Sequence, residues 1–345
     1  ALQRYWAVCP QLQSTLFGPR CPGYVDLQVV VPEIKSSIHR HAEFRAFTQA
    51  MTRHFEAWRK PTTARLKTLT PGFKPKDLVR ELSESLLVHY EHQPTARALI
   101  DPYAAYQHLT DYWAQTMQDD AYLVSEGGWK PETYRVLETK KGKDGKPGKT
   151  VDKGWACDLV PKALLVQHHF AAEQAELDRL SIELESTQEA MQDLEEKHGG
   201  EDAVFDGFDR VNDKEVKSRL KDVGNDAEAA EERDVLQHWL ALSEQAGALK
   251  RRIKALDAEL DSKALACYPK LNVAEVQAMV VDHKWMAALD AALHGELDSV
   301  SRALTGRVKV LAERYGQTLP SLAQQVTDLE ARVAGHLVKM GFAWR

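Results

Sequence analysis

Four charged residues in the middle of the chain have the types and spacing of a metal-dependent nuclease. Asp119 and Asp120 follow a helical run of apolar residues, and Glu138 and Lys140 lie two residues apart in a strand-like stretch. Residues two apart share one face of a strand. One of the aspartates and Glu138 could therefore hold Mg²⁺, while the lysine positions water or stabilises charge. The alternative is a solvated strand face with helix-end acids neutralised by a nearby Lys or Arg.

The two aspartates raise a question of their own. We expect the helix over residues 106–117 to end on Asp119 and Asp120, and a strand to follow. Carboxylates at a helix C-terminus oppose the helix dipole, typically by roughly 0.3–1 kcal/mol each. Two of them there require a partner. We expect hydrogen bonds from the backbone of the following hairpin, or a lysine or arginine within it.

A lysine-rich tip is the second candidate site. Residues 139–153 hold six lysines and two aspartates, and Gly and Pro residues give this segment reach. As a mobile arm it could contact DNA phosphates with release of counterions. The alternative is an exposed loop that lysine keeps soluble. The candidate phosphate contacts are Lys140, Lys141, Lys143, Lys146 and Lys149.

Residue types that often bind metals or nucleotides are present elsewhere in the chain, but they lack the spacing that such sites require. The histidine pairs have no evident third ligand for zinc, and neither G-x-G-x-x-G nor G-x-x-x-x-G-K-[ST] occurs. The cysteines form no CxxC pair, which is typical of free thiols in a reducing cytoplasm. The histidine pairs are His39/His41, His89/His92 and His168/His169, and the cysteines are Cys9, Cys21, Cys157 and Cys267.

Composition limits the class of protein. The chain has 345 residues, 43% of them hydrophobic and 28% charged, which suits a globular protein of two or three units. Its formal net charge is −6, so any DNA contact must come from a local basic patch. No run approaches the ~18 apolar residues of a membrane span, so we expect no membrane segment.

The elements that must position these residues are mostly helices. Apolar residues spaced three and four apart predict helices over 44–58, 78–86 and 106–117. A short strand is expected at 23–31. Strands at 133–140 and 150–160, joined by the lysine-rich loop, predict a β-hairpin.

Two longer apolar stripes, over 170–194 and 235–260, predict an antiparallel coiled-coil hairpin with a short helix at 216–223 between them. We therefore predict a mainly α protein, in which a helical domain carries a small β-hairpin insertion and a long antiparallel coiled-coil hairpin. In chain order we expect an N-terminal helical region (1–120), the hairpin insertion (121–160), the coiled-coil hairpin (161–265) and a C-terminal helical region (266–345).

The C-terminal region offers more apolar surface than its own packing needs. Asn272 and Glu275 resemble a capping box, one stripe runs over 289–311, and a second helix starts near Pro320 and ends near Gly341. Helices with spare apolar surface associate side by side. The candidate partner-docking residues are Leu322, Val326, Leu329, Val333 and Leu337.

Several stretches resemble a known family. "YQHLTDYWAQTMQDDAYLV", "KGWACDLVPK", "YPKLNVAEVQAMVVDHKW", "LTGRVKVLAERYGQTLPSL" and "HLVKMGF" are similar to the C-terminal region of modification subunits (HsdM family) of type I restriction–modification systems. The resemblance covers nearly the whole chain, and the stretches occur in the expected order. One departure is His283, where the family pattern has an acid.

The resemblance implies a function. Full-length members are S-adenosylmethionine-dependent adenine-N6 DNA methyltransferases in the cytoplasm. Their partners are a specificity subunit that reads double-stranded DNA, a restriction subunit and a second modification subunit. Their methylation motifs are a Gly-rich cofactor loop and N-P-P-[FY], which holds the flipped adenine.

Neither methylation motif occurs here. The resemblance therefore implies an assembly and DNA-facing region that follows a missing methyltransferase domain, with no catalytic, cofactor-binding or metal residue of its own. It also disfavours the nuclease, because cleavage in these systems belongs to the restriction subunit. A scaffold that does not touch DNA is the remaining alternative.

Overall fold

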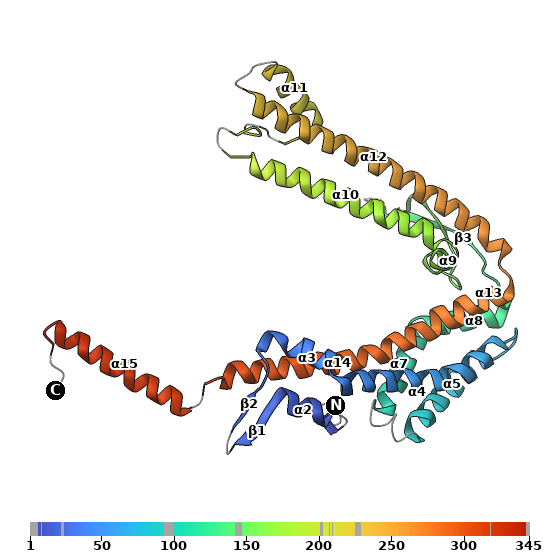
Figure 1. Ribbon diagram of the computed structural model, residues 1–345. Helices are drawn as coiled ribbons and strands as arrows, with labels where there is room; N and C mark the ends of the chain where they lie inside the picture. Colours follow the sequence, from blue (N-terminus) through green and yellow to red (C-terminus); the bar gives the residue numbers. More distant parts are fainter. Residues whose placement is uncertain are drawn as a thin grey trace. The chain divides into compact units, whose positions relative to one another are not determined.

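The structure is a computed structural model that describes residues 6, 7, 9–21, 24–92, 100–141, 147–200, 203–206, 208, 210–224, 229–317 and 319–342. Within these residues it is mainly α-helical with two small antiparallel sheets of two strands each, which confirms the predicted fold class (Figure 1). The chain divides into two compact units. Residues 1–128 and 281–345 form the first unit, and residues 129–280 form the second.

The first unit begins with a short helix and a two-stranded ribbon. Helix α2 (Pro10–Leu16) leads into strand β1 (Phe17–Cys21), which pairs with β2 (Tyr24–Leu27). The strand expected over 23–31 is therefore shorter than predicted. Its last residue instead starts the 3₁₀ turn η1 (Val31–Glu33), where Pro32 suits a first helical turn, and helix α3 (Ile34–Arg40) follows.

Two longer helices carry the predicted apolar stripes. They are α4 (Ala42–Lys67) and α5 (Pro75–His92). The indole Nε1 of Trp58 on α4 donates to Ser85 Oγ on α5 at 3.0 Å, so a hydrogen bond supplements their apolar contact. The buried stripe residues, all predicted, are Phe44, Phe47, Met51, Phe55, Trp58, Leu78, Leu82 and Leu86.

The stretch expected to change from helix to strand at Asp120 is one continuous helical run. It comprises α7 (Pro102–Tyr112), the π-helical segment η2 (Trp113–Met117) and α8 (Gln118–Gly127). The predicted strand is therefore wrong. Asp120, Ala121 and Val124 are all buried, at the spacing of one helical face, and the run ends at Gly128, whose φ is +75°.

After residue 280 the chain returns to the first unit. The π-helical segment η4 (Ala278–Met286) leads into α14 (Ala287–Tyr315), and α15 (Leu319–Lys339) follows. Helix α14 joins a hydrophobic core with α2, α3 and α4. That core comprises Cys9, Leu12, Leu16, Ile34, Ile38, Phe44, Phe47, Leu297, Leu304 and Val308.

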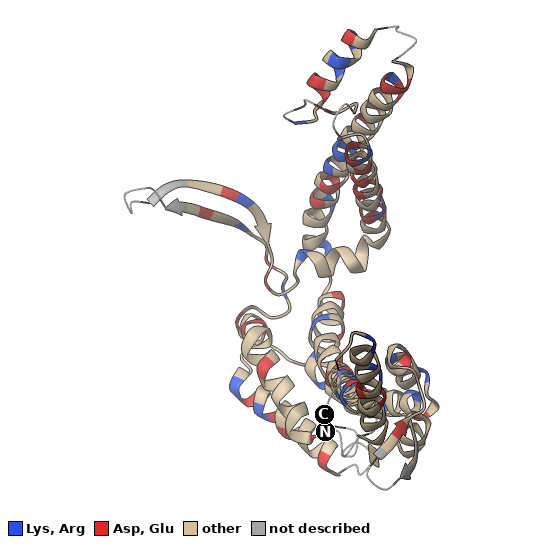
Figure 2. Ribbon diagram, turned by 90° about the vertical axis from the view of Figure 1, so that its left-hand side faces the viewer, with Lys and Arg blue, Asp and Glu red and all other residues tan. Residues whose placement is uncertain are grey.

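The second unit contains the predicted β-hairpin. Strands β3 (Tyr134–Lys141) and β4 (Pro147–Ala156) pair antiparallel, with Glu138 opposite Val151. Both strands carry acidic and basic residues (Figure 2). These charges pair across the hairpin, because Arg135 bonds Asp152 and Lys153 Nζ lies 3.1 Å from Glu138.

The coiled-coil hairpin is also present. After the short helix α9 (Lys162–His169), helices α10 (Ala171–Lys197) and α12 (Ala230–Cys267) lie side by side (Figure 1). Their antiparallel sense follows from a contact near each end, Glu173 with Lys263 and Glu195 with Trp239. The buried stripe residues are Leu177, Leu180, Thr187, Trp239, Ala246, Leu249 and Leu260.

Each end of the coiled-coil hairpin is closed by further contacts. At the far end the expected short helix, α11 (Asp213–Val223), buries Val216 with Phe205, Leu236 and Trp239. At the near end Asp261 accepts hydrogen bonds from Lys162 and Trp155. The chain then passes through η3 (Tyr268–Lys270) and α13 (Val273–Gln277), where the predicted capping box of Asn272 and Glu275 is formed.

Candidate functional site

The predicted docking stripe lies on an exposed helix. Helix α15 buries none of its side chains. Leu322 is 41% exposed, and Val326, Leu329 and Val333 are 54–55% exposed, while Leu337 is half-buried. The stripe alternates spacings of three and four residues over most of its length, which is the seam of a coiled coil. The stripe is therefore open to a partner.

The lysine-rich tip lies mostly outside the described residues. Lys143 and Lys146 fall in the undescribed segment 142–146. Lys140, Lys141 and Lys149 belong to the ends of β3 and β4, but their side chains are also outside what the structure describes. The backbone of Lys140 and Lys141 lies at the end of β3, and that of Lys149 lies near the start of β4. Their role as phosphate contacts stays a prediction.

Asp120 is a buried acid with two partners. Its Oδ1 lies 2.8 Å from Lys284 Nζ, and its Oδ2 accepts a hydrogen bond of 2.8 Å from Trp285 Nε1. The Asp120 side chain is only 4% exposed and that of Lys284 14%. The expected type of partner, a lysine, is therefore present, but it comes from η4 rather than from the β-hairpin. Asp119, the neighbouring acid, is exposed.

Further contacts join η4 to two other helices. Tyr112 on α7 donates its hydroxyl to the Lys284 carbonyl at 3.3 Å, and Lys67 at the end of α4 places its Nζ 2.6 Å from Asp282 Oδ2. Burial raises the pKa of Asp120, although Lys284 and Trp285 act in the opposite direction. Burial also raises the pKa of Tyr112, and the Asp120 charge adds to that effect. The arrangement holds η4 firmly against α7 and α8.

The other members of the proposed nuclease site have different partners. Glu138 is exposed and pairs with Lys153, and it belongs to the second unit, whereas Asp120 belongs to the first. The part of the chain that the structure describes contains no group of three or more His, Cys, Asp or Glu side chains that could hold a metal ion. The nuclease stays an untested alternative.

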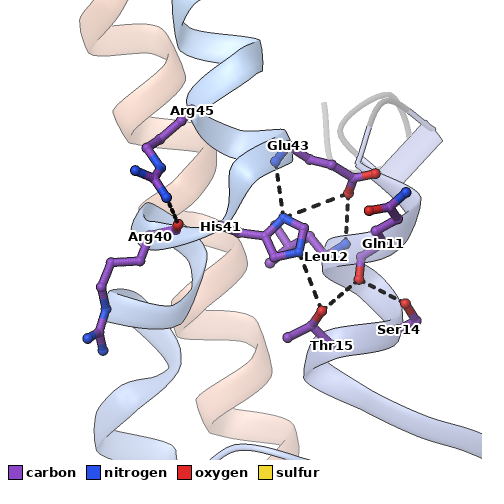
Figure 3. A network of polar contacts seen from close by, with 8 residues as sticks. All are labelled: Gln11, Leu12, Ser14, Thr15, Arg40, His41, Glu43 and Arg45. Carbon is purple, nitrogen blue, oxygen red and sulfur yellow. Dashed lines mark hydrogen bonds and ion pairs between the residues drawn. The ribbon is translucent and has the colours of Figure 1, made fainter.

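A hydroxyl, an imidazole and a carboxylate meet near the start of the first unit (Figure 3). Thr15 Oγ1 lies 3.4 Å from His41 Nε2, and His41 Nδ1 lies 3.9 Å from Glu43 Oε2. The order resembles a nucleophile, a base and an orienting acid. However, His41 Nδ1 accepts the Glu43 backbone N–H at 3.2 Å, so Nε2 carries the proton of a neutral ring and cannot take one from Thr15.

This network caps two helices instead. His41 is the N-cap of α4, and the Glu43 carboxylate accepts the Leu12 N–H at 2.8 Å in the first turn of α2. Each acceptor satisfies a donor that a helix start leaves unpaired. Sequence reasoning treated His41 only as half of a histidine pair, because nothing local indicates that Leu12 lies beside Glu43.

The cysteines behave as the sequence predicts where the structure describes them. Cys9, Cys157 and Cys267 form no disulfide bond among the described residues, and the Cys21 side chain lies outside them. Burial and the Glu43 charge raise the pKa of the Cys9 thiol to about 11, which makes it a poor nucleophile at neutral pH.

Comparisons with known proteins return nothing: no family model, no curated protein and no solved structure matches this chain. Among the described helices, none combines the length and apolar character needed to cross a membrane. A function for this chain must therefore be argued from the exposed stripe of α15, the lysine-rich segment 139–153 and the stretches that resemble the HsdM family.

Sequence reasoning missed Lys284 and Trp285. They follow Asp120 by more than 160 residues, so no local pattern connects them to it. One signal was present, because both residues lie in "YPKLNVAEVQAMVVDHKW" and Asp120 lies in "YQHLTDYWAQTMQDDAYLV". These two family-like stretches contact each other in the structure.

We predict that Asp120→Ala lowers the free energy of unfolding by about 3–5 kcal/mol, because it leaves the Lys284 ammonium buried without its carboxylate. Asp120→Asn should lose most of the same amount, since its amide nitrogen would face a donor. The matched control, Asp119→Ala, should stay within about 0.5 kcal/mol. Urea denaturation followed by circular dichroism measures all three, and equal effects at both positions would contradict the assignment.

The nuclease alternative makes a separate prediction. If it is right, Mg²⁺ or Mn²⁺ should produce DNA cleavage that Glu138→Ala and Lys140→Ala each abolish. We expect plasmid DNA to remain intact with either metal. Metal-dependent cutting by the unaltered chain that both variants lose would make the nuclease the better assignment.

Proposed function

We propose that this chain is the assembly and DNA-facing region of a type I modification subunit in the cytoplasm. Its helix α15 would dock the specificity subunit, and its lysine-rich tip would contact the phosphates of double-stranded DNA. Methylation from S-adenosylmethionine would belong to the methyltransferase domain of the full-length subunit. The restriction subunit and a second modification subunit complete the expected assembly.

The observation that carries the proposal is the uncovered stripe of α15. This helix has 21 residues and buries none of its side chains. Most helical stability in proteins comes from packing an amphipathic face rather than from intrinsic helix propensity. Leu329 and Val333, both 55% exposed, lie one turn apart in the middle of that face. A partner helix would supply the missing packing.

The distribution of charge along the chain supports the proposed contact with DNA. The chain is acidic overall, so general attraction to DNA is weak. Positive charge is instead concentrated along residues 139–153, which hold six lysines and two aspartates, and lysines suit phosphate contacts, which carry no base information. Such contacts position a complex on DNA and leave sequence recognition to another subunit.

We predict that Leu329→Glu with Val333→Glu abolishes co-purification of the full-length subunit with its specificity subunit. Helicity and melting temperature of the chain alone should be retained, because both side chains are exposed. Gln324→Glu with Ala331→Glu is the matched control, since it adds the same charge to the opposite face of α15. Retained co-purification would place docking elsewhere, and loss of folding would show that the stripe is internal.

For the tip, we predict that changing Lys141, Lys143, Lys146 and Lys149 to Ala weakens DNA binding by the assembled complex similarly on all sequences. The slope of log affinity against log salt should flatten by about 0.9 for each phosphate that the variant no longer neutralises. Four exposed lysines of α11 and α12 serve as a control when changed to Ala: Lys214, Lys221, Lys250 and Lys254. An unchanged affinity and slope would leave the tip as a solvated loop.

A further inference from the structure

A small basic pocket lies between α3 and α14 within the first unit. Its volume is about 220 Å³. Ile34 and Ile38 on α3 and Leu304 and Val308 on α14 share the hydrophobic core beneath, which holds the two helices together. The pocket residues Lys35, His39 and Lys309 each follow one of these core residues along the chain, so they flank the buried seam. Helices α3 and α14 themselves lie next to each other in Figure 1.

The walls of this pocket are positively charged. Lys35 and His39 come from α3, and Arg302 and Lys309 come from α14. None of the described residues that line the pocket is acidic. Three permanent cations around so small a volume, in a chain of net charge −6, create a local site for an anion. A guanidinium beside ammonium groups is a frequent combination for phosphate.

A buried hydroxyl in the pocket wall has no partner. Ser301 is 1% exposed, and its Oγ makes no hydrogen bond within the described structure. The hydroxyl of Thr305, one turn later, is satisfied because it donates to the Ser301 carbonyl at 2.9 Å. Buried polar groups without a hydrogen bond are uncommon and costly. An oxyanion in the pocket would give the Ser301 hydroxyl an acceptor.

Gly306 belongs to the exposed part of the pocket lining. A Cβ atom built on Gly306 would meet no other atom within 4 Å. Glycine inside a helix is less favourable than other residues, and here it leaves the space of a side chain in the pocket lining. A larger residue at position 306 would fill that space without removing any positive charge.

We propose that this pocket binds a phosphate group. Lys35, Arg302 and Lys309 supply the charge, and the Ser301 hydroxyl donates a hydrogen bond. The phosphate can belong to a nucleic-acid backbone or to a free phosphate-bearing molecule, because both present the same oxygen atoms. The inference requires nothing of α15, so it stands or falls independently of partner docking.

The first test measures the melting temperature of the whole chain in sodium phosphate against sodium chloride of equal ionic strength. Phosphate should raise the melting temperature. Lys35→Ala with Arg302→Ala should weaken the apparent affinity for phosphate at least tenfold. The matched control is Arg307→Ala with Arg314→Ala, which removes the same charge from exposed positions of α14 outside the pocket and should keep the phosphate effect.

Two further variants separate the pocket from general charge. Gly306→Leu should abolish the phosphate effect while the melting temperature in chloride is maintained, because leucine favours a helix more than glycine does. Ser301→Ala should leave the melting temperature in chloride unchanged or higher, yet reduce the phosphate effect. No phosphate-specific stabilisation of the unaltered chain would overturn the proposal. So would an effect that survives in both Gly306→Leu and the Lys35/Arg302 double variant.

The second test identifies the source of the phosphate by anisotropy of a fluorescent DNA duplex. If the source is DNA, the pocket variants should weaken duplex binding and inorganic phosphate should compete with the duplex. If duplex binding is unchanged while the phosphate effect is abolished in the same variants, the pocket serves a free phosphate-bearing molecule. Either result supports a phosphate site.

Discussion

The buried contact of Asp120 with Lys284 and Trp285 joins the two parts of the first unit close to the point where the chain leaves it and returns. This unit is discontinuous, because residues 129–280 are inserted between its two parts. Asp120 lies shortly before the insertion begins, and Lys284 lies shortly after it ends. The charge pair and the burial of Trp285 therefore join two segments that are 164 residues apart in the sequence.

The geometry of this junction involves two π-helical segments. Segment η2 immediately precedes α8, and η4 contains both Lys284 and Trp285. A π-helical turn holds an extra residue, so it rotates every later side chain about the helix axis relative to a regular α-helix. Asp120, Lys284 and Trp285 meet in that rotated frame. A sequence pattern with one regular helical period therefore does not predict which side chains face each other at this junction.

The apolar stripes of the coiled-coil hairpin are buried, whereas the apolar stripe of helix α15 is exposed. In the hairpin, α10 and α12 bury each other's stripes, and α11 covers the far end around Trp239. Helix α15 carries a similar stripe that none of the described residues buries. Proteins rarely leave a continuous apolar stripe in water unless another surface binds it. The stripes of α10 and α12 therefore serve internal packing, whereas the stripe of α15 is suited to binding another surface.

Much of the fold could be predicted from the sequence because it depends on local periodicity. The stripes of α4, α12 and α14, the capping box at Asn272 and the β-hairpin all follow from residues close together in the chain. The strand expected over 23–31 is shorter than predicted, and the run through Asp120 is the larger exception. Two acids near an expected helix end suggested a stop, but α8 continues because Lys284 and Trp285 bind Asp120 inside the fold.

The sequence by itself determined most of the long helices, the two hairpins and the residues of the apolar stripe of α15, since those depend on spacing along the chain. Only the tertiary structure decided which side chains meet across long separations. Lys284 with Asp120, Glu43 with Leu12, and Lys35 beside Arg302 come from segments that folding brings together. The exposure of α15 is equally a tertiary fact, because an amphipathic pattern is the same whether or not a partner covers it.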